Sequence, residues 1–216
     1  MNTSVFTAQR YSTKAFDASR KISAGDWENI QDALRQSPSS VNIQPWHFVI
    51  GSDDAGKARI AKAFTNYPFN TNKVLDASHV VVFASRVHAS DEFLNAILEQ
   101  EDKDGRYAKV EDKQTGDNVR RLFLGIHRND LKDEQEWFAR QTYLNLGFTL
   151  MTAAALGIDS VPMEGVDLAA LDTEFGLTEK GYQAVAVVSF GYRAADDFNA
   201  KLPKSRLADD VIFTQA

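Results

Sequence analysis

The chain of 216 residues carries 24 Lys and Arg against 30 Asp and Glu, and this net charge of -6 argues against a nucleic-acid binder. Its hydrophobic content of 44% and charged content of 25% predict one globular domain over residues 1–216. The absence of cysteine excludes disulfides and thiolate metal sites, and the first residues lack a signal-peptide pattern, so we expect a cytoplasmic protein that is not membrane-bound.

The first half of the chain contains clear helix start and stop signals. Ser23 and Asp26 stand at capping-box spacing, and the helix that follows must end before Pro38, which disfavours helical geometry at Ser37. Residues 78–85 are β-branched and apolar on both faces, which predicts a central covered strand. The other expected elements are a strand over 47–51, a helix from 54 to about 64, a loop over 66–69, and a helical turn capped by Asn70 that reaches Leu75.

The second half contains the longest helical pattern, residues 133–156, which is apolar nearly all round after Tyr143 and ends at Gly157. We expect this segment to be a buried core helix. Residues 104–116 are polar and are expected to form a mobile surface excursion. The other expected elements are a helix over 91–102 capped by Ser90, a helix over 119–127, strands over 160–163 and 182–192, and a helix between Asp167 and Gly176.

Helices and strands do not alternate strictly along the chain, so a doubly wound parallel sheet is disfavoured. An α+β arrangement with a buried central helix fits the pattern better. The segment after Asp197 lacks core periodicity apart from residues 211–213. Two interpretations stay open for it: a disordered tail, or a tail wrapped on a partner subunit.

Three short stretches are the candidate functional site. Basic clusters at residues 10–14 (RYSTK) and 204–206 (KSR) lie almost the whole chain apart, and a polar loop, SPSSVNIQP, runs between Pro38 and Pro45. Guanidinium, ammonium and hydroxyl groups are the donors that hold a phosphate. Each cluster alone is most simply a solvated surface, but their combination indicates one phosphate-bearing ligand.

Several other patterns are weaker. The segment 51–58 (GSDDAGKA) copies phosphate-loop spacing, but Ala58 replaces the magnesium-binding hydroxyl and two aspartates would oppose an anion, so a capped strand-to-helix turn is expected. The four histidines lack metal-ligand spacing, and His79 is expected to be packed or hydrogen-bonded. The sequence contains no G-x-G-x-x-G loop. The turn at Glu164–Gly165 is either only a turn or a place where backbone approaches a flat ligand.

Long motifs throughout the chain, among them RYSTKAFD, SPSSVNIQPWHF, DASHVVVFAS, QEDKDGR, VPMEGVD and DFNAKLPKSR, resemble the FMN-dependent nitroreductase family. Within it the chain most resembles the bacterial oxygen-insensitive NAD(P)H nitroreductases that also act as dihydropteridine reductases. The resemblance implies a nitroreductase-like fold with a mainly antiparallel sheet, flanking helices and a tail wrapping the partner. It also implies a homodimer with two FMN molecules at the interface.

The resemblance implies these roles residue by residue: Arg10, Ser12, Lys204 and Arg206 on the FMN phosphate; Lys14, Asn70 and Lys73 at the pyrimidine edge; Pro162, Met163, Glu164 and Gly165 beside the ring; Ser39, Ser40, Asn42 and Gln44 on the FMN of the other subunit; Tyr67, Phe69 and Phe123 around the substrate; and Arg106 on the nicotinamide nucleotide. Tyr11 belongs to the FMN set but stands where close relatives often have His, and Leu122 stands where a second aromatic can occur.

The expected function is therefore two-electron reduction of nitroaromatics and quinones by NADH or NADPH through bound FMN, in a ping-pong sequence. Flavin reductase or dihydropteridine reductase activity is the alternative within the family. Two further alternatives are a nucleotide hydrolase acting through segment 51–58 and an interaction module without cofactor.

Overall fold

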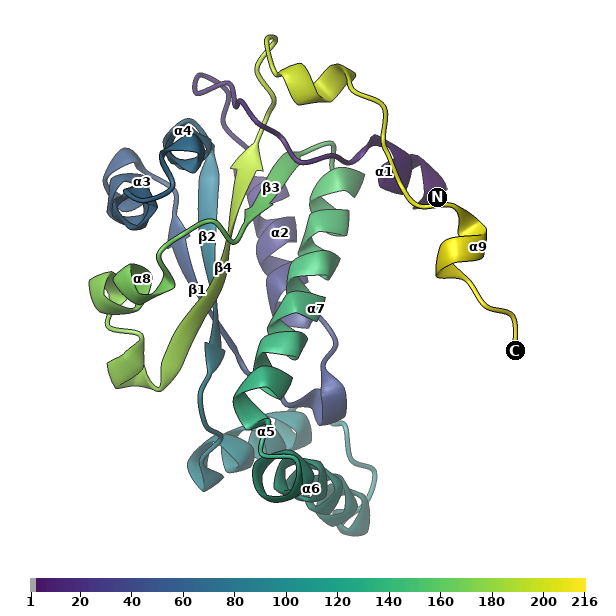
Figure 1. Cartoon of the computed structure of the whole chain (residues 1–216). Helices are drawn as coiled ribbons and strands as arrows, with labels where there is room; N and C mark the ends of the chain where they lie inside the picture. The colour runs from purple at the N-terminus through teal and green to yellow at the C-terminus, as the bar shows by residue number, and fades with distance from the viewer. Residues whose placement is uncertain (1–2) are drawn as a thin grey trace.

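The computed structural model describes residues 3–216, with side chains from residue 5 onward (Figure 1). Its longer elements are the helices α1 (Thr3–Gln9), α2 (Ala24–Gln36), α3 (Asp54–Ala61), α4 (Thr71–Leu75), α5 (Asp91–Lys103), α6 (Val110–Gly125), α7 (Glu134–Ala155), α8 (Leu168–Phe175) and α9 (Asp209–Ile212), and the strands β1 (Trp46–Gly51), β2 (His79–Arg86), β3 (Asp159–Met163) and β4 (Tyr182–Gly191).

The strands form one sheet in the order β1-β2-β4-β3, and every neighbouring pair is antiparallel. The two central strands are the ones whose sequences are apolar on both faces, and β2 is buried from Val80 to Ser85. The register between β2 and β4 shifts once, between Phe83 and Ala84. The α+β class and the antiparallel sheet implied by the resemblance are thus confirmed.

Alternate residues of β2 feed two separate cores, because successive side chains of a strand point to opposite faces. Val80 and Val82 pack with residues of α3, α4 and α8. Val81 and Phe83 pack with residues of α2 and α7. Figure 1 shows these two helical layers on opposite sides of the sheet. A third cluster, around Phe138, joins α5 and α6 to the start of α7.

Most of the expected helix ends are confirmed by hydrogen bonds. The hydroxyl of Ser23 accepts from the Asp26 N–H, that of Ser90 from the Phe93 N–H, and the Asp167 carboxylate from the Ala170 N–H. Gly176 closes α8 in the left-handed conformation. The expected capped turn at 51–58 is also confirmed, because Asp53 accepts from the Gly56 N–H at 2.6 Å.

Three expectations were wrong. Asn70 precedes α4 but makes no cap bond, because its amide is engaged elsewhere. The stretch 104–116 is not one surface loop, since α6 already begins at Val110. Helix α7 is not buried on all sides: Phe138 and Thr149 are buried, but the face carrying Tyr143, Leu144 and Phe148 is exposed. The sheet covers only one side of α7, which leaves this second apolar face open.

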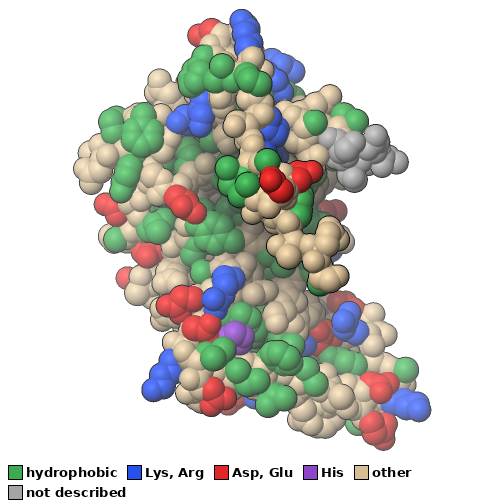
Figure 2. All heavy atoms as spheres, turned by 45° about the vertical axis from the view of Figure 1, so that its right-hand side comes forward, with side chains coloured by type: hydrophobic (Ala, Val, Ile, Leu, Met, Phe, Trp, Pro, Cys, Tyr) green, Lys and Arg blue, Asp and Glu red, His purple; other side chains and the backbone are tan. Residues whose placement is uncertain are grey.

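The carboxyl-terminal segment is exposed from Lys201 onward and includes a short turn at Phe198–Lys201 and helix α9. It runs past α1 and lies on the side of α7 away from the sheet (Figure 1). Figure 2 shows hydrophobic side chains exposed on this side. Within residues 3–216, every helix is too short or too polar to cross a membrane.

Candidate functional site

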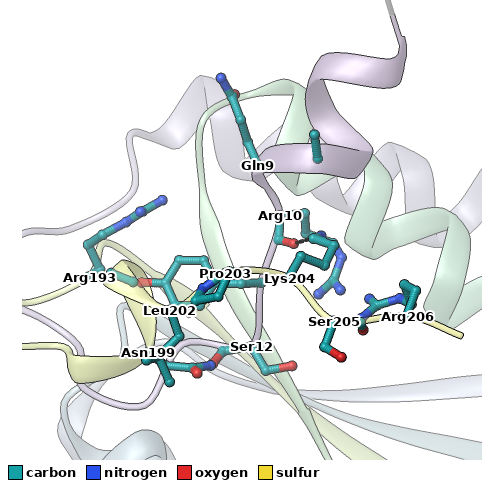
Figure 3. Close-up of a pocket in the computed structure, with 13 residues that line it drawn as sticks. Gln9, Arg10, Ser12, Arg193, Asn199, Leu202, Pro203, Lys204, Ser205 and Arg206 are labelled. Atoms are coloured by element: carbon teal, nitrogen blue, oxygen red, sulfur yellow. Dashed lines mark hydrogen bonds between the residues drawn. The ribbon is translucent and has the colours of Figure 1, made fainter.

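The two basic clusters meet, although they lie at opposite ends of the sequence. A cavity of about 720 Å³ is lined by Arg10, Ser12, Lys204 and Arg206, together with their neighbours in the two end segments and Arg193 (Figure 3). Tyr11 lines the same cavity. The predicted convergence of these residues is therefore present in the structure of one chain.

Hydrogen bonds between the two ends of the chain shape this cavity. The Lys204 ammonium donates to the backbone carbonyls of Thr7 (2.6 Å) and Arg10. The Tyr11 hydroxyl donates to Asp197 Oδ2 at 2.8 Å, and the Lys14 N–H donates to the same oxygen at 3.2 Å. Burial and the bond to Asp197 raise the pKa of Tyr11. Tyr11 thus ties the two ends of the chain together through its side chain.

Burial and like-charge repulsion both act on the cations around the cavity. Burial lowers the pKa of Arg10, and the neighbouring Arg206 lowers it further. Desolvation also lowers the pKa of Lys204, with additional contributions from Arg10 and Arg206. Cations held this close destabilise each other's charged form, so an anion placed between them is stabilised.

A second group forms around Gly165. Lys73 Nζ donates to Asn70 Oδ1 at 2.6 Å, and Asn70 Nδ2 donates to the Gly165 carbonyl at 3.0 Å. A Cβ on Gly165 would lie 3.1 Å from Asn70 Nδ2, tighter than an ordinary contact, and at van der Waals distance from Tyr67 and Phe69, so an added side chain would press on the Asn70 amide. The glycine is explained by crowding within the chain itself. Phe69 is 68% exposed and forms the open edge of the group.

The charge of Lys14 acts on Lys73 of this second group. Burial lowers the pKa of Lys73, and the nearby Lys14 ammonium lowers it further. Lys73, which is bound to the Asn70 amide, therefore lies within electrostatic range of Lys14. Two cations at this edge favour a ligand that carries or develops negative charge there.

The segment 162–165 leaves β3 and joins the second group. The Met163 side chain is buried in the core, so a contact from this residue to a ligand has to come from its backbone. Glu164 instead points its carboxylate toward α7, where Oε1 accepts from the Tyr143 hydroxyl at 2.6 Å. Burial, and then Glu164, raise the pKa of Tyr143 to about 12. Pro162 pairs with Val188 of β4.

The polar loop of residues 39–44 is strained. Val41, Asn42 and Gln44 have φ values of 46°, 53° and 44°, a region that costs a non-glycine residue about 1–3 kcal/mol. Hydrogen bonds hold this geometry: the Ser40 N–H donates to Gln141 Oε1 at 2.9 Å, and the Gln44 N–H donates to Ser39 Oγ at 3.0 Å.

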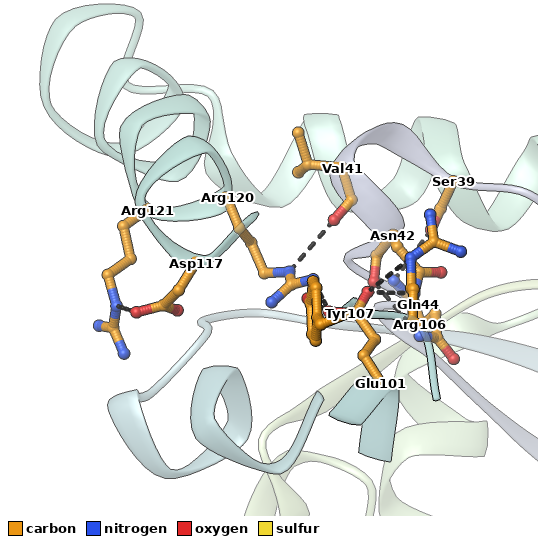
Figure 4. Close-up of polar contacts among 10 residues, drawn as sticks. All are labelled: Ser39, Val41, Asn42, Gln44, Glu101, Arg106, Tyr107, Asp117, Arg120 and Arg121. Carbon is orange, nitrogen blue, oxygen red and sulfur yellow. Dashed lines mark hydrogen bonds and ion pairs between the residues drawn. The ribbon is translucent and has the colours of Figure 1, made fainter. Parts of the chain in front are cut away.

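The Asn42 amide is engaged by Glu101 of α5, at 2.7 Å from Nδ2 to Oε1 (Figure 4). Glu101 also accepts from Tyr107 and Arg120. Burial alone raises the pKa of this carboxyl, but the three donors together lower it below its ordinary value.

Within one chain, the loop and the cation cavity lie at opposite ends of α7. The loop contacts Gln141, whereas Arg10 lies beside Ala154. These two positions are separated by roughly 20 Å at about 1.5 Å per residue. The predicted phosphate residues and the loop residues, which were assigned to the FMN of the other subunit, therefore form two separate groups in a single chain.

The predicted substrate residues are divided in the same way. Tyr67 and Phe69 precede β2, near α4, whereas Arg106 and Phe123 follow it, near α5 and α6. Arg106 lines a cavity of about 930 Å³ beside the 39–44 loop and lies 3.9 Å from Glu101. Phe123 is 41% exposed. The expected single pocket bordered by Phe69, Phe123 and Arg106 is not formed within one chain.

Sequence reasoning missed several residues of these groups. Arg193 and Asn199 line the cation cavity, and Asn199 Nδ2 donates to the Ser12 carbonyl at 2.8 Å. Tyr143 and Glu101 were read only as parts of helices. The signal for Glu101 was its place in QEDKDGR, the motif in which only Arg106 was assigned a role.

The fold and the two groups define a class of protein: an α+β chain that gathers cations from both ends of its sequence for an anionic ligand. The chain belongs to the nitroreductase family, because the model of that family matches residues 7–192. The family inferred from sequence motifs is thereby confirmed.

Individual relatives agree. The chain is 51% identical to the oxygen-insensitive NAD(P)H nitroreductase of Salmonella typhimurium, over 96% of both chains. It is 35% identical to the major NAD(P)H-flavin oxidoreductase of Aliivibrio fischeri, over 94% of both. A crystal structure from Exiguobacterium sibiricum in complex with FMN has a TM-score of 0.83 at 23% identity, covering 100% of this chain and 98% of that one, which supports the fold alone.

Proposed function

We propose that the protein is an FMN-dependent NAD(P)H oxidoreductase that reduces nitroaromatics and quinones by transferring electron pairs. The observation that carries this proposal is the meeting of Arg10, Lys204 and Arg206 at one cavity. Together with the lysine pair near Gly165, it fits a ligand with a phosphate at one end and an electron-accepting ring at the other. The identity to oxygen-insensitive NAD(P)H nitroreductases supports the same activity.

Bound FMN supplies hydride chemistry, accepting a hydride from NAD(P)H and passing one to the acceptor. The residues of the chain bind and orient it. Arg10, Lys204 and Arg206 hold the phosphate through charge-assisted hydrogen bonds. Lys14 and Lys73 stabilise negative charge that develops at the ring end, and Asn70 holds Lys73 in place through its 2.6 Å hydrogen bond.

We propose that two copies of the chain form the complete site. The open apolar face of α7 and the exposed tail supply a surface for a second copy. The 39–44 loop, Arg106 and Phe123 of one copy then complete the cation cavity and the Gly165 group of the other. Sedimentation tests this step: a folded, FMN-loaded monomer at dilute concentration contradicts it. The cytoplasmic location also stays a prediction.

Two measurements test the reaction. The purified protein should show a flavin spectrum in the visible range, which the alternatives of a hydrolase or a cofactor-free module do not produce. Double-reciprocal plots of initial rate against acceptor concentration, measured at several NAD(P)H concentrations, should give parallel lines. The reason is that the oxidised donor leaves the open face before the acceptor binds there. Intersecting lines indicate a ternary complex and refute the shared-site mechanism.

A second candidate is reduction of free flavins, favoured by the identity to the Aliivibrio fischeri flavin oxidoreductase. Dihydropteridine reduction is the remaining alternative. A panel of nitroaromatic, quinone, flavin and pteridine acceptors, each tested with NADH and NADPH, ranks these activities by kcat/KM.

A further inference from the structure

One buried carboxylate of α5 collects donors from the 39–44 loop, from the connection between α5 and α6, and from α6. Glu101, whose side chain is 6% exposed, accepts from Asn42 Nδ2 through Oε1 and from Arg120 Nη2 through Oε2, at 2.7 and 2.6 Å. Tyr107 donates to Oε2 as well, and Arg106 Nε lies 3.9 Å from Oε1. Figure 4 shows these side chains converging beside the loop.

The partners of Glu101 lie at the strained point of the loop. Arg120 Nε donates to the Val41 carbonyl at 3.1 Å, while its Nη2 is bound to Glu101. Val41 and Asn42 are the two adjacent residues with left-handed backbone, which is unfavourable for a β-branched residue such as Val41. The buried ion pair therefore contacts both residues, one through its carbonyl and one through its side chain.

The bond to Glu101 also fixes the orientation of the Asn42 amide. An ionised carboxylate only accepts hydrogen bonds, so the amide must turn its nitrogen toward Glu101. The amide oxygen of Asn42 is then directed away from this carboxylate.

We propose that Glu101 and Arg120 are positioning residues for the cofactor site. They hold Val41 and Asn42 in the left-handed conformation and direct the Asn42 amide oxygen toward the ligand. This inference rests on the proposed function, in which the 39–44 loop contacts FMN bound mainly by the other subunit.

The adjacent Arg121 provides a matched control. It joins α6 to α5 through Asp91 (2.5 Å) and Asn95 (2.9 Å), and it also bonds to Asp117 of its own helix (2.8 Å). These bonds involve no residue of the 39–44 loop. Breaking them weakens the union of α5 and α6 without touching the loop.

The test compares Glu101→Gln with Arg121→Gln. Hydrogen exchange of the amides of residues 40–44 is measured on FMN-free protein, and the FMN dissociation constant is measured by fluorescence titration. In Glu101→Gln we expect loop exchange and the dissociation constant each to rise roughly tenfold or more, the effect of losing one charge-assisted hydrogen bond. In Arg121→Gln we expect a lower unfolding midpoint, while the loop exchange and the FMN dissociation constant stay at their wild-type values.

A double variant, Glu101→Gln/Arg120→Gln, keeps the test decisive if the single variant does not fold, because it removes both buried charges together. It should fold and show the same fast loop exchange. Three results would each overturn the proposal. The folded Glu101 variants could exchange the amides of residues 40–44 at the wild-type rate, Arg121→Gln could raise this exchange equally, or both Glu101 variants could fail to fold. Wild-type protein that binds no FMN refutes the proposed function instead, and the exchange measurement still decides whether the pair orders the loop.

Discussion

Replacement of Arg206 by Ala tests the phosphate-binding role of the cation cavity. The Arg206 guanidinium lines the cavity, and its hydrogen bond runs to the carbonyl of the adjacent Ser205 at 2.5 Å. The residue is exposed, so its loss should leave the fold intact. A hydrogen bond to a charged group contributes about 1.5–3 kcal/mol, which corresponds to a roughly 10- to 150-fold higher FMN dissociation constant. Lys204→Ala is a less selective test, because it also releases the tail from Thr7.

The assay is titration of FMN-free protein with FMN and, separately, with riboflavin, which lacks the phosphate. Arg206→Ala should weaken FMN binding and leave riboflavin binding at the wild-type level. Lys201→Ala is the matched control, because it removes one positive charge from the same exposed tail outside the cavity lining. Equal losses for the two flavins, or equal losses in the two variants, refute the phosphate-binding role of this cavity.

Three further predictions concern other parts of the molecule. Lys14→Met should slow the bleaching of the flavin by NAD(P)H in stopped-flow measurements, beyond any loss of flavin affinity, because one of the two cations near Asn70 is removed; an unchanged rate in flavin-saturated protein contradicts this. Burial, and then the charges of Lys21 and Lys57, lower the pKa of His79 from 6.5 to about 4. As pH drops, the unfolded chain therefore takes up this proton before the folded protein does. The free energy of unfolding should fall between pH 6.5 and about 4. Urea denaturation over this range measures the fall, and His79→Gln should flatten it. Phe138→Ala should lower the free energy of unfolding by about 3–5 kcal/mol, because Phe138 is fully buried between α5, α6 and α7; a loss below about 1 kcal/mol would show that this cluster is not tightly packed.

Local signals predicted most of the fold. The cap at Ser23, the stop at Pro38 and the apolar run of β2 each depend on neighbouring residues only, and each is confirmed. His79 was expected to be packed, and its ring stacks on Trp27 at 3.9 Å between centroids. The helix start at Val110 was missed because the first turns of α6 are polar and exposed, and their periodicity is weak.

Features that depend on distant parts of the chain were not predictable from local pattern. The sequence of α7 is apolar on two faces, but only the fold shows that the sheet covers one of them. Asn70 has the side chain of a helix cap, but its Oδ1 accepts from Lys73 and its Nδ2 donates to the Gly165 carbonyl, contacts that local sequence does not reveal. The left-handed backbone of Val41 has no sequence signal, because β-branched residues avoid it. The motif resemblance proposed the site residues and assigned the 39–44 loop to the other subunit, but the roughly 20 Å between the loop and the cation cavity follows only from the fold.

This separation has a consequence for genetics. A subunit with Arg206→Ala is impaired in the cation cavity, and a subunit with Asn42→Ala is impaired in the loop at the other end of α7. In a dimer whose sites combine the two ends from different copies, pairing these subunits produces one site with both defects and one site with neither. Each such mixed dimer keeps one intact site of two, and random pairing makes about half of the dimers mixed, so co-expression of two such alleles should restore about a quarter of the wild-type activity. Two alleles altered in the same group should not complement.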